Sequence, residues 1–249
     1  MGLMKIKNRA PGCRWIAPMA PDHSILKRVC RSLAALLLLG LTAQSDLGEP
    51  FGMTTETLPE GPSWVTWRNL QSQMKADERV VLQCRVQPRA CPSFDAQKFI
   101  EIADEGRFYT DDDGRRGDLG RINRAVNLSL SPVKSGTKWT SPLSALAAGI
   151  GDCKQYSVLK YAALKNADFA ADDLRIVILQ PKLEKQTHAV VTIRTGNRWL
   201  VLDNRTMVMA DSKALLGQNI PLFALDDRGV RQFTVRIASR DLNGCEAGT

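Results

Sequence analysis

The stretch GIGDCKQYSVLKYAAL, residues 149–164, places one cysteine directly after Gly-Asp and directly before a run of helical pattern. Gly149 and Gly151 end the preceding segment, PLSALAAG, so a helix is expected to begin at Cys153. Unpaired backbone N–H groups and the positive end of the dipole at a helix N-terminus favour a thiolate over a thiol. Because the thiolate is the nucleophilic form, Cys153 is a candidate nucleophile, or else a small buried hydrophobe.

A nucleophilic cysteine usually needs a histidine that takes up its proton. The chain has two histidines, His23 and His188, and His23 falls in the leader described below. His188 opens the run HAVVTIRT, and Gly196-Asn197 joins this run to RWLVLD, which is typical of a β-hairpin. His188 is therefore the expected base.

The hairpin also predicts the third member of a triad. With Gly-Asn as the loop, Thr195 faces Arg198 and His188 lies opposite Arg205, so Asp203 is a diagonal neighbour of His188 on the same face. Such neighbours have Cα atoms about 7–8 Å apart, within reach of a carboxylate and an imidazole. We expect Asp203 to orient the ring and to stabilise its protonated form.

Around this constellation, helices come first and strands second, which predicts an α+β domain. Helical patterns cover 63–105 in two pieces with Ser63 and Ser93 as N-caps, then 118–130, then the segment after Ser141 and Pro142. Strand patterns cover 174–180, 188–195, 198–203 and 232–238. Two buried faces are expected, one formed by Trp64 and Trp67 and the other by Leu119, Ile122, Val126 and Leu130.

The net charge of +8 is concentrated in a leader. Residues 1–45 hold seven Lys or Arg and one acid, so the rest of the chain has 27 bases against 25 acids and no basic face typical of nucleic-acid binding. Lys27, Arg28 and Arg31 precede the apolar run LAALLLLGL (33–41), which is too short to be a permanent membrane anchor. This predicts a secretory signal peptide over 1–45, an irregular lead-in over 46–62 and one domain over 63–249.

Export would remove Cys13 and Cys30 and leave Cys84, Cys91, Cys153 and Cys245. Cys84 and Cys91 flank a short polar loop, where a disulfide or two free thiols are the alternatives. No cysteine or histidine cluster has zinc-ligand spacing. Asp111, Asp113 and Gly114 resemble part of a calcium loop but lack its later glutamate, so 109–118 is predicted to be a solvated loop.

The blocks GDCKQYSVLKY, HAVVTI and WLVLDNR, with RAVNLSLSP and TKWTSPLSALAAG upstream, resemble the bacterial transglutaminase-like cysteine peptidases. The resemblance covers roughly residues 60–240. It implies a papain/transglutaminase-like fold, with a helical part that carries Cys153 packed on an antiparallel sheet that carries His188 and Asp203. It implies the same three roles and a thioester intermediate.

The best-known branch of that family consists of periplasmic proteases that cut surface adhesins and depend on calcium. Its motif commonly continues with acidic residues after the cysteine, where this chain has Lys154 and Gln155. We therefore expect no cofactor or metal, calcium being possible by family analogy only. Lys154 either lowers the pKa of the thiol or points to solvent. The Cys153 N–H is the natural oxyanion donor, and a second donor is open among Asn127, Trp139 and Gln155.

The expected function is that of a periplasmic cysteine peptidase or amidase acting on a protein substrate, such as a cell-surface or periplasmic protein. Two alternatives remain open. One is acyl transfer to an amine by the same triad, as in a transglutaminase. The other is a non-catalytic scaffold that uses the groove to bind a partner.

Overall fold

The computed structural model describes residues 48–108, 112–134, 136 and 138–234. All of these residues belong to the unit Leu47–Thr249. The predicted signal peptide, with Cys13, His23 and Cys30, lies outside the described residues, as does Cys245. In the described part, no helix has both the length and the apolar character needed to cross a bilayer.

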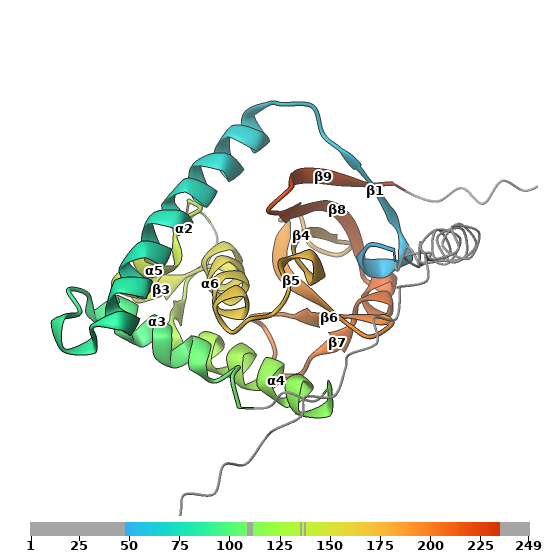
Figure 1. Cartoon of the computed structure of the whole chain (residues 1–249). Helices are drawn as coiled ribbons and strands as arrows, with labels where there is room; N and C mark the ends of the chain where they lie inside the picture. The colour runs from blue at the N-terminus through green and yellow to red at the C-terminus, as the bar shows by residue number, and fades with distance from the viewer. Residues whose placement is uncertain (1–47, 109–111, 135, 137, 235–249) are drawn as a thin grey trace, which may run out of the picture. The chain divides into compact units, whose positions relative to one another are not determined.

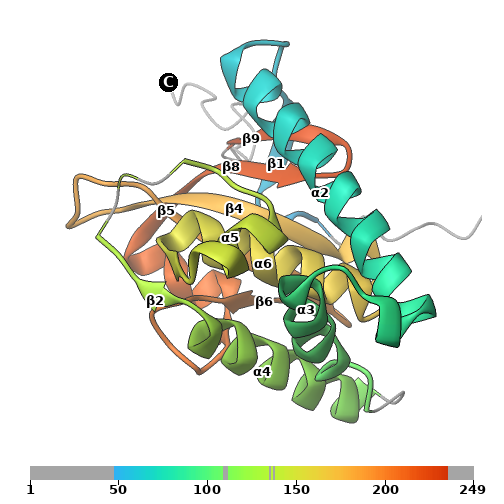
Figure 2. The same ribbon diagram turned by 90° about the vertical axis from the view of Figure 1, so that its left-hand side faces the viewer.

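Four helices form a layer around a fifth (Figures 1 and 2). The outer helices are α2 (Pro62–Val86), α3 (Phe94–Asp104), α4 (Asp112–Ser129) and α5 (Pro142–Ala148), and the central one is α6 (Cys153–Asn166). Apolar side chains of α6 are buried on all sides, including Val158, Leu159 and Leu164. A helix buried all round belongs in the core, which is where α6 lies.

A seven-stranded antiparallel sheet packs against α6. Its order is β1-β9-β8-β4-β5-β6-β7, formed by β1 (Thr54–Thr57), β4 (Leu174–Pro181), β5 (His188–Thr195), β6 (Arg198–Leu202), β7 (Ala210–Asp211), β8 (Asn219–Asp226) and β9 (Gly229–Thr234). A second, parallel pair joins β2 (Ser131–Pro132) to β3 (Ile150–Gly151). The order of helices before strands confirms the α+β class.

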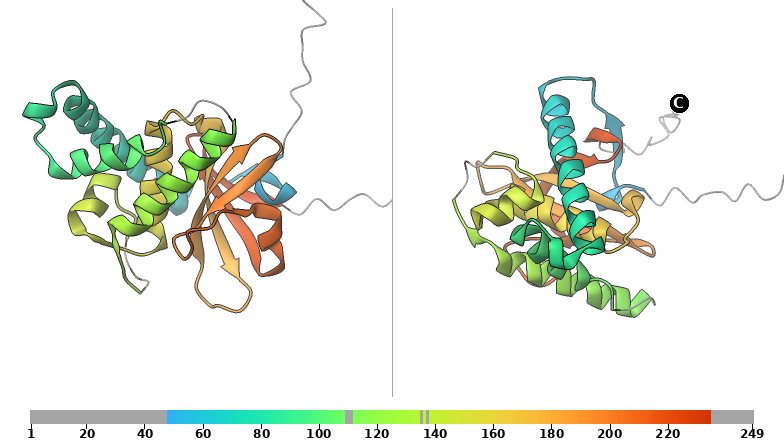
Figure 3. Two further views of the ribbon diagram at one scale, coloured as in Figure 1. Left: turned by 90° about the horizontal axis from the view of Figure 1, so that it is seen from below. Right: turned by 60° about the vertical axis from the view of Figure 1, so that its left-hand side comes forward.

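Alternate residues of the central strands serve two cores. Ile176, Val191 and Leu202 belong to the large core shared with α6, whereas Val177, Val190 and Val201 belong to a smaller core on the other face. Short 3₁₀ turns cover that outer face, η1 (Pro50–Gly52) and η4 (Ser212–Gly217), as the left view of Figure 3 shows. Both faces are buried, which explains the β-branched runs of β4 and β5.

The helix caps are partly as predicted. Ser93 caps α3 by accepting a hydrogen bond from the N–H of Ala96 at 3.1 Å. The predicted cap at Ser63 is wrong, because Pro62 takes the first helical position and Gly61 becomes the N-cap. Ser141 is the N-cap of α5, but its hydroxyl contacts the Ser144 hydroxyl and not a backbone N–H.

Both predicted apolar faces are confirmed. Trp67 is buried and its indole N–H donates to the carbonyl of Asp226 at 2.8 Å. Trp64 packs on Gly229, where a Cβ would come within 1.9 Å of the ring, so this position of the sheet requires glycine. Leu119, Ile122 and Val126 are likewise buried along α4, as is Leu130 directly after it.

Three segments differ from expectation. The lead-in over 46–62 is not wholly irregular, because β1 pairs with β9 at the edge of the sheet. The acidic run predicted as a solvated loop begins α4 at Asp112 instead. Strand β8 was not predicted, and β9 ends its described part at Thr234, so residues 235–238 of the predicted strand lie outside the described residues.

A disulfide joins Cys84 to Cys91. It closes the turn between the end of α2 and the start of α3, across η2 (Pro88–Ala90). Of the two alternatives for this pair, the disulfide is the one that the structure has. Cys153 is the free cysteine among the described residues.

Candidate active site

The N-terminus of α6 is held by a capping box. The Asp152 carboxylate accepts from the N–H of Lys154 at 2.9 Å, and the Gln155 side chain accepts from the N–H of Asp152 at 3.0 Å. Gly151 permits this closure, because a Cβ there would lie 2.7 Å from Cβ of Gln155. Gly149 ends α5 with a φ of 65°, a conformation that favours glycine. Together they place Cys153 at the first position of α6, as predicted.

His188 and Asp203 reach the site from the β5–β6 hairpin. The register pairs Thr195 with Arg198 and Val191 with Leu202, which confirms the predicted hairpin. His188 Nε2 lies 2.9 Å from Asp203 Oδ1. The N–H of Arg205 donates to the same oxygen at 2.9 Å and fixes the carboxylate. The two residues therefore meet as the diagonal argument requires.

Cys153 completes a line of three side chains. The side chain of His188 and the backbone N–H of Ala189 lie beside its sulfur, and both lower the pKa of the thiol. Since Nε2 of His188 faces Asp203, Nδ1 is the ring nitrogen that can face the sulfur. The structure thus brings all three predicted residues together: Cys153 from the helix, His188 from β5 and Asp203 from the segment directly after β6.

The electrostatics of the line favour a thiolate. Burial raises the pKa of the Cys153 thiol, but the hydrogen bonds from His188 and the Ala189 N–H, with the charge of His188, hold it below its ordinary value. Burial lowers the pKa of His188, but the hydrogen bonds with Asp203 and Cys153 raise it to about 9. At pH values between the two pKa values, thiolate and imidazolium coexist.

Asp203 stays ionised for the same reasons. Burial raises the pKa of its carboxyl group, yet the hydrogen bond and charge of His188, the N–H of Arg205 and the charge of Lys160 hold it below its ordinary value. Asn127 supports the backbone here, since its Nδ2 donates to the Asp203 carbonyl at 3.1 Å. Asn127 therefore serves the loop that carries the acid.

Two of the three oxyanion candidates have other partners. The amide of Asn127 is used as just described, and Gln155 closes the capping box and donates to the carbonyl of Lys138. Trp139 is half-buried, between Lys138 and Thr140, which both contact Gln155. The N–H of Cys153 has no partner within α6, as for any first helical residue, and remains the natural donor.

Lys154 does not point freely to solvent. Its ammonium group lies 2.7 Å from Asp152 Oδ2, so it pairs with the N-cap carboxylate. The charge of Asp152 raises the pKa of the Cys153 thiol, and Lys154 neutralises part of that charge. Within the described residues, no group of three His, Cys, Asp or Glu side chains could hold a metal ion. At the start of α6, the Asp152 carboxylate is already occupied by the Lys154 ammonium group and by the cap of the helix.

Lys160 is a buried cation that sequence reasoning missed. Its side chain is 1% exposed, and its Nζ has no hydrogen-bond partner among the described residues. Burial lowers the pKa of its ammonium group to about 7, against the opposing effect of the Asp203 charge. The signal was present in the sequence: Lys160 lies four residues after Tyr156 in a run that is otherwise mostly apolar.

Two contacts show which part of α4 lies beside Lys160. The Tyr156 hydroxyl donates to the Leu130 carbonyl at 2.6 Å at one end, and the Arg115 guanidinium lies over the Phe169 ring at 3.7 Å at the other. The helices therefore run antiparallel, with Lys160 beside the middle of α4. Side-chain oxygens buried there without a hydrogen-bond partner among the described residues belong to Asn123 and Asn127.

Comparison with known proteins identifies the family. Residues 83–214, more than half of the chain, match the family described as bacterial transglutaminase-like cysteine proteinase. The chain belongs to this family. It is accordingly a transglutaminase-like cysteine peptidase, and the resemblance seen in the sequence is confirmed. None of the curated protein sequences matches the chain.

Solved structures agree on the fold. LapG of Legionella pneumophila in its calcium-bound form has a TM-score of 0.51 and 18% identity, over 66% of this chain and 93% of LapG. The EGTA-treated form also has a TM-score of 0.51 and 18% identity, over 64% of this chain and 87% of LapG. This peptidase therefore has the expected α+β papain/transglutaminase-like fold.

Proposed function

We propose that this peptidase hydrolyses a peptide bond of a protein substrate through Cys153, His188 and Asp203. The observation that carries the proposal is the line in which Asp203 contacts His188 at 2.9 Å and His188 lies beside the sulfur at the N-terminus of α6. Nucleophile, base and orienting acid in this order are the arrangement that acyl transfer requires.

In the proposed reaction, the Cys153 thiolate attacks the carbonyl carbon and forms a tetrahedral oxyanion near the Cys153 N–H. The imidazolium of His188 gives its proton to the leaving amine as the C–N bond breaks, which leaves a thioester. His188, now neutral, takes a proton from water, and the hydroxide attacks the thioester. The thiolate leaves, the acid product is released, and the imidazolium is restored.

The first test of the triad is the pH dependence of Cys153 alkylation by iodoacetamide. The reference protein carries Cys13→Ser, Cys30→Ser and Cys245→Ser, so that Cys153 is its remaining free thiol if the Cys84–Cys91 disulfide is intact. Fast alkylation at mildly acidic pH is expected, with a large loss of that rate in His188→Ala. Reaction only near the ordinary thiol pKa of about 8.5 in both proteins would exclude the ion pair.

Product analysis separates peptidase activity from its alternatives. Incubation with denatured casein and added glycine ethyl ester should yield cleaved peptides, with new N-termini at the cut sites. Amide-linked glycine ethyl ester with little cleavage would indicate acyl transfer instead. No product of either kind, from a protein whose Cys153 alkylates as expected, would favour the scaffold.

We also propose that the protein is exported to the periplasm. The basic and apolar leader supports this, as does the Cys84–Cys91 disulfide, because disulfides persist in oxidising compartments. Cell fractionation followed by N-terminal sequencing should find a chain that begins near Gln44 or Asp46. A full-length chain in the cytoplasmic fraction would contradict export.

The proposed activity does not require calcium. LapG has been solved in a calcium-bound form, but here the Asp152 carboxylate pairs with Lys154 and caps α6. Addition of EGTA should leave the rate of casein cleavage unchanged. A loss of activity that calcium restores would show that other residues of the chain bind the ion.

A further inference from the structure

A cavity lies on the helical side of the sheet, between α2 and strands β4, β8 and β9. Its volume is about 410 Å³, within the usual ligand-pocket range of about 300–1,000 Å³. Trp67 and Leu70 of α2 form buried parts of its wall, and Val230 of β9 another. Thr66, on the exposed side of α2, also lines it, so the cavity is open to solvent.

Two of the residues that line the cavity, Ile178 and Trp139, are close to residues that contact or neighbour Cys153. Ile178 of β4 is the cross-strand partner of Ala189, whose N–H contacts the Cys153 sulfur. Trp139 also lines the cavity, and its neighbours Lys138 and Thr140 both contact the side chain of Gln155. Gln155 is two positions after Cys153 in α6. A peptide whose carbonyl reaches Cys153 therefore has this cavity within a residue or two of the bond that is cut.

The lining is mostly apolar. Trp139, Ile178 and Phe223 are half-buried and give the cavity apolar surface that solvent reaches. Ser63 and Thr66 line it on the exposed side of α2, and none of the described residues that line it is charged. The cavity beside His188 and Asp203 differs, because Lys182, Glu184 and Arg205 line its volume of about 590 Å³. The two sides of the nucleophile thus present different chemistry.

We propose that the cavity between α2 and the sheet is a specificity subsite for a large apolar side chain of the peptide substrate, aromatic or branched aliphatic. This rests on the proposed function, since it assumes that Cys153 attacks the substrate. Such a side chain would leave water on entering a pocket whose aromatic walls lie partly exposed in the free enzyme. Transfer of that apolar surface, on both partners, would supply the binding free energy.

The test uses dipeptidyl chloromethyl ketones, in which the Cys153 thiolate forms a C–S bond and chloride leaves. The series carries Phe, Gly or Asp at each of the two positions. Phe at one position should give inactivation roughly 10- to 100-fold faster than Gly, from burial of one apolar side chain. Asp at that position should react more slowly than Gly. Iodoacetamide, which lacks a side chain for the cavity, measures the nucleophile alone.

Thr66→Trp should fill the cavity from the exposed side of α2. It should abolish the preference for Phe and leave the iodoacetamide rate unchanged. Val65→Trp is the matched control, since it adds the same bulk to an exposed neighbouring position that is not part of the lining, and it should keep the preference.

Equal rates for Phe, Gly and Asp, with a normal iodoacetamide rate, would overturn the subsite and leave the triad standing. A Phe preference that survives Thr66→Trp would also overturn it, because the selectivity would then arise elsewhere. An iodoacetamide rate without the acidic-pH enhancement would overturn the proposed function and this inference together.

Discussion

Asp203 controls how far the thiolate–imidazolium pair extends toward alkaline pH. Its carboxylate contributes to a pKa of about 9 at His188. In Asp203→Asn, the pKa of His188 should fall toward its ordinary value of about 6.5. The imidazolium then loses its proton at lower pH, so the alkaline limb of casein cleavage should move to lower pH, measured as initial rate against pH.

Asp173→Asn is the control for that profile. Asp173 pairs with Arg194 near the far end of β5, away from His188, and its loss should leave the alkaline limb in place. An unchanged limb in Asp203→Asn would show that another group holds the imidazole proton.

Lys160 is predicted to destabilise the folded protein in a pH-dependent way. Burial lowers its pKa to about 7 in the folded state, against about 10.4 in an unfolded chain. At high pH both states are neutral, so there is no penalty. As the pH falls from 10 to 7 the unfolded chain binds a proton that the folded one does not, and below pH 7 the penalty is complete.

Lys160→Met should therefore raise the free energy of unfolding, most below pH 7 and least near pH 10. The upper bound is about 1.4 kcal/mol for each unit of pKa difference. Urea unfolding at pH 6 and pH 10 measures the change. Lys165→Met is the control, because Lys165 is more exposed and pairs with Asp227 at 2.8 Å. A larger gain at pH 10 than at pH 6 would contradict the assignment.

The individual residues of the triad could be predicted from the sequence, because each depends on local rules. Cys153 follows two glycines and a capping aspartate, and the hairpin loop fixes which residues face His188. The spacing of Lys160 from Tyr156 indicates that Lys160 is buried, but the neighbours of Lys160 and the role of Asn127 could not be predicted in this way. Both depend on which part of α4 packs beside α6, a tertiary contact that no local spacing specifies.

At the scale of elements, the turn into α6 is the feature on which the site depends most. Gly151→Ala would place a Cβ 2.7 Å from Cβ of Gln155 and 3.1 Å from a Leu130 methyl group. Relief of this overlap must shift the capping box and the adjacent Cys153. We expect a loss of about 1–3 kcal/mol of stability and slower alkylation of the thiol, measured by urea unfolding and by iodoacetamide.

Gly217→Ala is the matched substitution. Nothing lies within 4 Å of a Cβ at Gly217, and its φ is not in the left-handed region, so stability and alkylation should not change. Equal behaviour of the two variants would mean that the turn tolerates a side chain and that its geometry does not set the reactivity of Cys153.

The elements that escaped prediction share a physical cause. β1, with the sequence TTET, is a polar edge strand, and within the part of the chain that the structure describes it pairs with β9, far along the sequence. β8 contains Pro221 at a point where its register with β4 shifts, which masks the strand pattern. β1 is placed by long-range pairing with β9, and β8 pairs at long range with β4 besides forming a hairpin with β9, whereas the β5–β6 hairpin is decided by its own loop.

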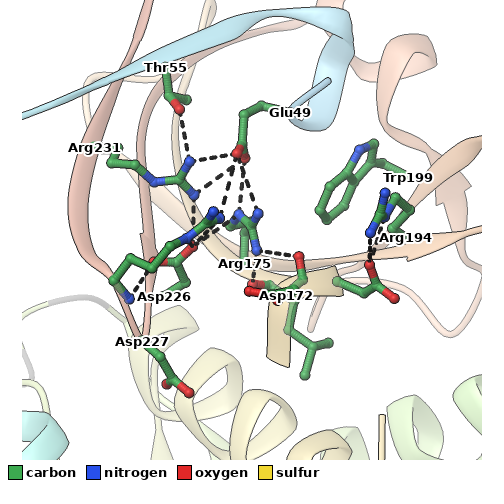
Figure 4. Close-up of polar contacts among 12 residues, drawn as sticks. Glu49, Thr55, Asp172, Arg175, Arg194, Trp199, Asp226, Asp227 and Arg231 are labelled. Carbon is green, nitrogen blue, oxygen red and sulfur yellow. Dashed lines mark hydrogen bonds and ion pairs between the residues drawn. The ribbon is translucent and has the colours of Figure 1, made fainter. Parts of the chain in front are cut away.

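At the scale of the whole molecule, the triad forms only where the helical layer meets the sheet. Cys153 belongs to the helix that both layers enclose, and its partners belong to β5 and the segment after β6. Any contact that holds the strands of the sheet together therefore stabilises the triad indirectly. The segment before β1 is such a contact, because Glu49 connects it to β4 and β9 (Figure 4).

Figure 4 shows Glu49 beside the guanidinium groups of Arg175 and Arg231, with Asp226 of β8 on the other side of them. The guanidinium group of Arg228 joins the cluster, 3.8 Å from Glu49 and 3.0 Å from Asp226. Arg175 Nε lies 3.0 Å from Glu49 and 3.2 Å from Asp226, and Arg231 contacts both acids. Loss of one partner leaves buried charge unbalanced, so Glu49→Gln should cost about 3 kcal/mol of unfolding free energy at neutral pH. Urea unfolding measures it.

The pH dependence of this loss has a defined sign. Burial raises the pKa of Glu49, but the hydrogen bonds and charges of Arg175 and Arg231 hold it below its ordinary value. The stabilisation is therefore complete above the unfolded-state pKa of about 4.3 and is lost as the pH falls through the lower folded-state pKa. The difference in unfolding free energy between wild type and Glu49→Gln should therefore shrink as the pH falls through that range.

Glu60→Gln is the control. It removes the exposed pair with Arg68 and should cost less than about 1 kcal/mol of unfolding free energy at any pH. Equal costs for the two variants would show that Glu49 makes only a surface contact, and that the segment before β1 is not anchored by charge.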